Sequence, residues 1–107
     1  MAKVAVFLTD LFEDIEYIEP TRAFRAAGHE LTHVGLEAGE TVRGFKTGIP
    51  VRIEKGVKEV SADHFDALLI PRGQTLDQLR KNRHAENLLR EFLQKRKPIF
   101  TTRRKDS

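Results

Sequence analysis

Hydrophobic residues along the chain are concentrated in four short β-prone runs. The first, Lys3–Asp10, is apolar almost without interruption, which is typical of a strand buried on both faces of a parallel sheet. The remaining runs are His29–Glu37, Asp66–Gly73 and the residues from Ile99 onward. The pattern therefore predicts four core strands.

The segment between the first two strands has the pattern of a helix. Its acidic residues come early, its arginines come late and Gly28 follows as a stop signal, which matches the charges to the helix dipole. The apolar residues that fall near helical spacing are Ile15, Ile18, Ala23 and Ala26. Because Pro20 lies inside this segment, the helix is expected either to kink there or to begin at that turn.

Further elements are predicted between and after the other strands. Two short alternating runs, Val42–Phe45 and Val51–Ile53, favour a β-hairpin. Ser61–Phe65 begins with a residue suited to an N-cap and predicts one helical turn. Thr75–Lys97 carries a leucine-rich stripe of helical period, with a break at Asn82–Arg83.

The order of these elements predicts an α/β fold, a three-layer sandwich with a flavodoxin-like open parallel sheet of strand order 2-1-3-4 and a small hairpin excursion. Its length indicates a single domain, residues 1–107, with a core over 3–100 and a basic tail over 101–107. Ligands of such sheets bind beyond the carboxyl ends of the strands, here at Thr9–Asp14, Pro71–Gln74 and after Phe100.

The positive charge of the chain is concentrated at its end. Residues 95–107 contain six Lys or Arg and one Asp, whereas residues 1–94 contain 13 basic and 15 acidic residues. The main body therefore has no basic surface of the kind that binds nucleic acid, and the tail lacks aromatics for base stacking, so a solvated end is the simpler interpretation. There is no cysteine and no apolar run of membrane-spanning length, and we expect a cytoplasmic protein that does not bind membranes.

Four sequence blocks together resemble the PfpI family of cysteine-peptidase-like and deglycase-like proteins, within the class I glutamine-amidotransferase-like superfamily. The blocks are FEDIEYIEP, RAAGHELTHVG, FDALLIPRG and KRKPIF, in this order. The resemblance extends from Lys3 to Phe100. It implies a chain cut before the family's nucleophile elbow, since members of the family are longer.

The resemblance also implies roles for individual residues. Glu16 matches a glutamate that hydrogen-bonds the catalytic cysteine, Glu13 matches a neighbouring acid, and the amide of Gly73 would help to stabilise an oxyanion. Asp77 matches an acidic position that some relatives present to another subunit. Arg103 and Arg104 stand where the family's Cys-His pair would fall, with Lys105 in place of the following glycine. No cofactor is implied.

Structural alternatives exist for several of these residues, and Gly73 could be an ordinary loop glycine. Glu13, Asp14 and Glu16 could simply favour the dipole of a helix N-terminus. Arg72, where the family has glycine, could obstruct a small-molecule pocket or adapt it to an anion, and we favour obstruction. The four histidines lie on different predicted elements, without the helical i,i+4 spacing of a metal-binding pair, so no metal site is expected.

Two hypotheses for function follow. In the first, the chain is a PfpI-like domain that is catalytically inactive on its own because the nucleophile is missing. In the second, it is an interaction module that pairs through an exposed sheet edge with itself or with a full-length relative.

Overall fold

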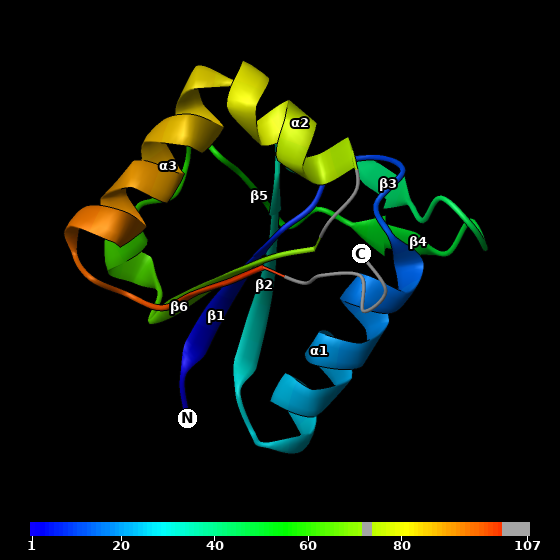
Figure 1. The fold of residues 1–107 in the computed structure, drawn as a ribbon, viewed down its shortest axis with the longest axis horizontal. Coiled ribbons are helices and arrows are strands. Elements are labelled where there is room, and N and C mark those ends of the chain that lie inside the picture. Colours follow the sequence, from blue (N-terminus) through cyan, green and yellow to red (C-terminus); the bar gives the residue numbers. More distant parts are fainter. Residues whose placement is uncertain (72–73, 102–107) are drawn as a thin grey trace.

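A five-stranded parallel sheet forms the centre of the protein (Figure 1). The computed structural model describes residues 1–71 and 74–101. The strands, in spatial order, are β5 (Lys55–Gly56), β2 (Glu30–Gly35), β1 (Lys3–Phe7), β6 (Ala67–Ile70) and β7 (Ile99–Thr101). The predicted order 2-1-3-4 is thus confirmed as β2-β1-β6-β7. The two-residue strand β5, too short to give a pattern in the sequence, extends the sheet beyond β2.

The central strands are apolar on both faces because both faces are covered. In β1, Ala5 and Phe7 pack into one hydrophobic cluster, whereas Val4 and Val6 pack into the other. All four residues of β6 are buried in the same alternating way. The continuous apolar runs in the sequence therefore predicted doubly covered strands correctly.

Helices and a hairpin form the two outer layers (Figure 1). One face of the sheet is covered by α2 (Gln74–Lys81), α3 (Arg83–Gln94) and the 3₁₀ turn η1 (Ala62–His64). On the other face lie α1 (Asp14–Ala26) and the hairpin of β3 (Thr41–Arg43) and β4 (Pro50–Arg52). These layers confirm the three-layer α/β sandwich and the excursion predicted between Val42 and Ile53.

Helix α1 differs from the sequence prediction in where it begins and in which side it buries. It begins at Asp14, so the alternative of a start at Pro20 is wrong, and Pro20 lies within it. The predicted apolar stripe is wrong except at Ile18, which packs against the core. Ile15 is 60% exposed, whereas Tyr17 and Thr21 are buried. The buried side follows long-range contacts of Tyr17, which the local spacing of small and apolar residues does not encode.

The predicted break between the two C-terminal helices has a physical basis in capping. Asn82 is the N-cap of α3, and its side-chain oxygen accepts a hydrogen bond from the amide of Ala85 at 3.0 Å. Ser61 caps η1 in the same manner by accepting from the amide of Asp63. Local side-chain chemistry therefore sets both helix starts where the sequence predicted them.

Candidate functional site

The carboxyl ends of β1, β6 and β7 meet at one edge of the sheet, next to the start of α1. Parallel pairing aligns Val6 with Leu69, and Ile70 with Thr101, so that all three strands end on the same side of the sheet. Parallel α/β sheets bind ligands at this edge. The structure therefore brings the first turn of α1 to the place where the sequence predicted a site.

Glu16 is the most unusual side chain at this edge. The residue is only 7% exposed, and neither carboxylate oxygen has a hydrogen-bond partner among the residues that the structure describes. An unsatisfied buried polar group costs about 1–3 kcal/mol, so native proteins keep few of them. Its burial without a partner is evidence against the view that this acid only serves the helix dipole, since an exposed carboxylate would do that without a desolvation cost.

Asp14, two residues earlier, has a structural role instead. Its carboxylate is buried and accepts hydrogen bonds from the amides of Lys46 and Thr47, at 2.8 and 3.1 Å, and from the Thr47 hydroxyl. Burial acts to raise the pKa of Asp14, but these hydrogen bonds outweigh it and hold the pKa below its ordinary value. Asp14 thus anchors the hairpin loop to α1.

The loop can approach this carboxylate only because residue 44 is glycine. A Cβ placed on Gly44 would lie 2.2 Å from Oδ2 of Asp14. The contact continues through the amide of Phe45, which donates to the carbonyl of Phe12 at 2.8 Å. The hairpin is therefore fixed against the loop that leads into α1.

Asp10 reinforces the same junction. Its Oδ1 accepts the amide of Arg43 at 2.8 Å, and the amide of Leu11 donates to the carbonyl of Arg43 at 2.8 Å. Leu11 has a φ of 63°, an uncommon conformation for a branched side chain that is often found near functional sites. Asp10 therefore anchors the hairpin to the segment that follows β1.

A small cavity of about 200 Å³ lies at the same edge, above the ends of β1 and β2. Its lining residues are Thr9, Asp10, Leu11, Leu36, Glu40 and Gln78. Sequence reasoning had identified Thr9 and Asp10 but missed Glu40 and Gln78. Glu40 lies just before β3 and Gln78 within α2, so only the tertiary fold brings them to the edge of the sheet, and no local motif marks them.

The other predicted site residues that the structure describes are Glu13 and Asp77. Glu13 is half-buried at the N-cap of α1, where its backbone carbonyl accepts the amide of Tyr17 at 3.2 Å. Asp77 lies in the first turn of α2 with an exposed side chain. The remaining predicted positions, Arg72, Gly73, Arg103, Arg104 and Lys105, lie outside the described residues.

Within residues 1–71 and 74–101, no group of three or more His, Asp or Glu side chains could hold a metal ion. Three of the histidines form hydrogen bonds with other residues of the chain. Nδ1 of His29 accepts the amide of Ala2, and Nδ1 of His64 accepts the amide of Ser61. His33 bonds Tyr17 and Glu54.

None of the helices in the described part of the chain is long and apolar enough to cross a membrane.

Chemically, the site offers a buried carboxylate, that of Glu16, whose oxygens accept no hydrogen bond from the described part of the chain, at the carboxyl edge of a parallel sheet. Such a group can accept a hydrogen bond from a thiol or hydroxyl that reaches it, or take a proton from it. The 107-residue sequence contains no cysteine, so a thiol is not available within it.

These features define a three-layer α/β protein with an acidic site at the carboxyl edge of its sheet. A comparison with protein families matches residues 2–102 to the DJ-1/PfpI family. The chain belongs to this family, as the sequence blocks predicted.

Individual relatives agree with this assignment. The chain is 44% identical over 98 residues to general stress protein 18 of Bacillus subtilis and 43% identical to protein/nucleic acid deglycase 2 of Escherichia coli. Each alignment covers 92% of this chain and 57% of the relative, so the chain spans little more than half the length of these proteins.

Among solved structures, the chain is similar to a two-domain protein from Anabaena variabilis that contains DJ-1/ThiJ/PfpI-like and ferritin-like domains. The TM-score is 0.89 at 27% identity, and the match covers 94% of this chain and 29% of that protein.

Proposed function

We propose that Glu16 is the supporting carboxylate of a PfpI-type site and that the 107-residue chain has no hydrolase or deglycase activity by itself. The observation that carries this proposal is the buried carboxylate of Glu16, which has no hydrogen-bond partner in the described structure. A protein tolerates the cost of such a group where function requires it. We also propose that the protein is located in the cytoplasm, as expected from the sequence.

The chemistry of the chain supports the inactive part of the proposal. Cysteine-dependent hydrolysis requires a thiolate, and the sequence has no cysteine. A carboxylate alone can act as an acid or base, but it needs a partner within hydrogen-bond reach, and Glu16 has none among the described residues.

The experiment measures turnover of methylglyoxal and of peptide substrates by the purified chain, after circular dichroism has shown that it is folded. We expect no turnover above buffer for the wild type, for Glu16→Gln or for the control Glu19→Gln, whose exposed carboxylate is on the same helix. Robust wild-type turnover that disappears in Glu16→Gln and persists in Glu19→Gln would overturn the inactive part of the proposal.

An exposed strand favours a second candidate function, an interaction module. In the described structure β7 is the last strand of the sheet and pairs only with β6. Phe100 in this strand is 44% exposed and meets the ring of Phe24 edge to face, at 5.5 Å between centroids. Exposed strand edges with apolar side chains promote pairing with another chain.

Light scattering at micromolar concentration tests this second candidate. We expect self-association that Phe100→Lys weakens. The matched control is Leu93→Lys, because Leu93 is 62% exposed on α3, on the other face of the sheet. A stable monomer at all concentrations, both alone and when mixed with a full-length relative, would exclude an interaction module of this kind.

A further inference from the structure

A groove along α1 lies apart from the candidate site and contains two arginines. It has a volume of about 510 Å³, within the usual range for small-molecule sites, and is lined by Tyr17, Ile18, Thr21, Arg22, Arg25 and Ala26. None of these residues belongs to the carboxyl-edge site. The sequence did not predict this groove, because Arg22 and Arg25 were interpreted there only as basic residues that favour the dipole at the end of the helix.

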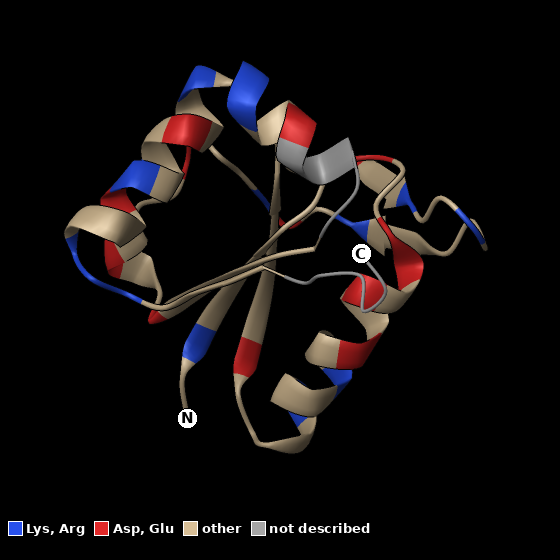
Figure 2. Ribbon diagram, viewed as in Figure 1, with Lys and Arg blue, Asp and Glu red and all other residues tan. Residues whose placement is uncertain are grey.

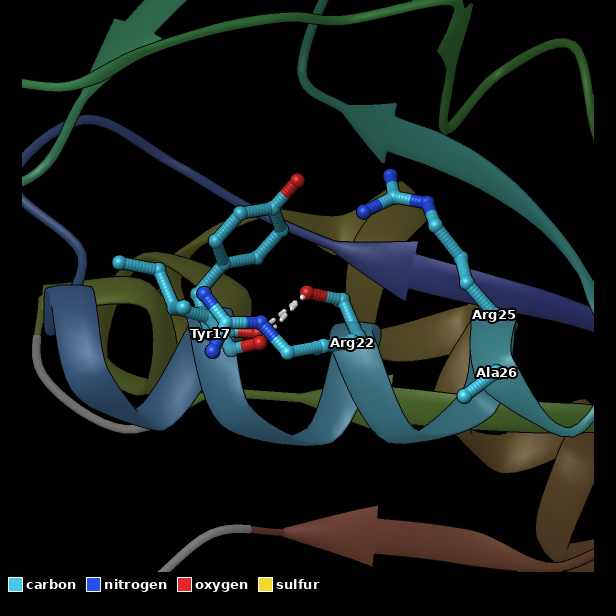
Figure 3. A pocket seen from close by; sticks show the side chains of 6 residues that line it. Tyr17, Arg22, Arg25 and Ala26 are labelled. Atoms are coloured by element: carbon cyan, nitrogen blue, oxygen red, sulfur yellow. Dashed lines mark hydrogen bonds between the residues drawn. The ribbon is translucent and has the colours of Figure 1, made fainter.

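The two guanidinium groups border the ring of Tyr17 (Figure 3). Arg22 runs back along the helix toward Tyr17, and Arg25 points away from α1 on the side to which the Tyr17 hydroxyl also points. Figure 2 shows that the acidic residues of α1 lie toward its start and the basic ones toward its end. Across residues 1–71 and 74–101, no carboxylate forms an ion pair with Arg22 or Arg25, so both cations can bind an external anion.

A hydrogen-bonded chain holds the wall of the groove in place. Oε1 of Glu54 accepts the backbone amide of His33 at 2.7 Å and lies 3.1 Å from Nδ1 of the same residue. Because a carboxylate can only accept a hydrogen bond, we place the ring proton of His33 on Nδ1. Nε2 then accepts a hydrogen bond from the Tyr17 hydroxyl at 2.8 Å. The hydroxyl of Tyr17 donates its only proton to His33, so it cannot donate a hydrogen bond to a ligand. A ligand in the groove would therefore contact the ring of Tyr17, and its negative charge would be bound by the two arginines.

We propose that this groove binds an oxyanion attached to an apolar group, with Arg25 and Arg22 holding the anionic end. The planar guanidinium forks suit the paired oxygens of a phosphate or carboxylate. The Tyr17 ring, Ile18 and Ala26 form an apolar surface for the remainder of the ligand. A bare inorganic anion would leave that surface unused, which is why we infer a ligand with both parts.

His33 supplies a spectroscopic readout of binding. Burial lowers the pKa of His33 below its ordinary value, Glu54 opposes this effect, and the charge of Arg25 adds to the lowering. The groups that face the ring are Tyr17 and Arg25 from α1 and Glu54 from the segment after β4. An anion bound at Arg25 offsets the positive charge and raises the pKa of His33.

The experiment titrates the full chain with phenyl phosphate and follows the imidazole signals by NMR as a function of pH, with His33→Gln used to assign the His33 signal. We expect saturable binding and an upward shift of the His33 pKa. Inorganic phosphate should bind more weakly than phenyl phosphate, and benzoate distinguishes a carboxylate-binding groove from a phosphate-binding one.

Arg25→Gln should weaken the binding of phenyl phosphate about tenfold, the loss expected for a charge-assisted hydrogen bond. The matched control is Arg90→Gln, which removes the same charge from an exposed position on α3, in the opposite layer. An unchanged His33 pKa, equal losses in the two variants, or inorganic phosphate binding as tightly as phenyl phosphate would each overturn the proposal.

Discussion

Two buried acids on the first turn of α1 have opposite environments. Asp14 accepts three hydrogen bonds from the hairpin loop, whereas Glu16 accepts none within the described structure. Residues two positions apart on a helix point about 200° apart, so the two side chains cannot share one set of partners. We therefore expect the first carboxylate to stabilise the fold and the second to lower its stability.

Replacing Asp14 by Asn should lower the free energy of unfolding by about 1–3 kcal/mol at pH 7, because the donors of Lys46 and Thr47 lose a charged acceptor. The pKa of Asp14 is lower in the folded state than in the unfolded chain. Its contribution is therefore complete above the unfolded value of 3.8 and is lost as pH falls through the folded pKa.

Urea titrations of wild type and Asp14→Asn between pH 7 and pH 2 measure this difference. We expect the two stabilities to converge at the acidic end. Glu19→Gln on the same helix, at an exposed position, serves as the control and should have little effect. A constant difference over the whole pH range would mean that the charge of Asp14 is not what stabilises the hairpin.

Replacing Glu16 by Leu should raise the free energy of unfolding by about 1–3 kcal/mol, since it removes a buried polar group that has no partner. Chemical denaturation gives the measurement. Glu19→Leu, at an exposed position on α1, should change stability far less. A loss of stability in Glu16→Leu would show that the carboxylate has a stabilising partner in solution.

At the scale of elements, the start of α3 is set locally, whereas the packing of α1 is not. Asn82 supplies the cap that separates α2 from α3 and could be identified in the sequence. The buried side of α3 also follows its leucine-rich stripe in part, since Leu88 and Phe92 are buried. The position of α1 depends on distant contacts, and its predicted stripe was wrong.

Asn82→Ala should lower the free energy of unfolding by about 1 kcal/mol, because the amide of Ala85 loses its capping acceptor. Thermal and urea denaturation followed by circular dichroism measure the loss. Asn82→Asp should retain most of the stability, since aspartate is an equally good cap. Equal losses in the two variants would show that the contribution of Asn82 is not capping.

At the scale of the whole molecule, the sheet is covered on both faces, but several large apolar side chains are exposed on the surface of the protein. Ile15, Phe45, Leu93 and Phe100 are all exposed, and β7 has only one neighbouring strand in the described structure. A 107-residue chain buries a smaller share of its surface than a longer domain and must still order its whole backbone. We therefore expect modest stability.

Calorimetry of the purified chain should give a melting temperature below about 65 °C, within the ordinary range for small domains or lower, or a broad transition with weak near-ultraviolet circular dichroism. A sharp two-state transition above about 70 °C would contradict the expectation of modest stability. Repeating the scan at several protein concentrations separates intrinsic stability from stabilisation by self-association.

The sequence by itself determined the fold class, the strand order β2-β1-β6-β7, the hairpin and the break at Asn82. These features depend on residues that are close together in the sequence. The spacing of apolar residues indicates whether a strand is buried on one face or on both, and capping residues act within a few positions. It also placed Glu16 near the carboxyl edge of the sheet, through the resemblance and through the rule that parallel strands end on one side.

Only the tertiary structure decided which acid of the first turn of α1 is structural and which has no hydrogen-bond partner among residues 1–71 and 74–101. Asp14 meets Thr47, 33 positions along the chain, and no local pattern encodes that contact. The same reason explains β5 and the cavity residues Glu40 and Gln78. Each is formed by segments that are distant in sequence, and the side chain at each position is selected by a neighbour that only folding supplies.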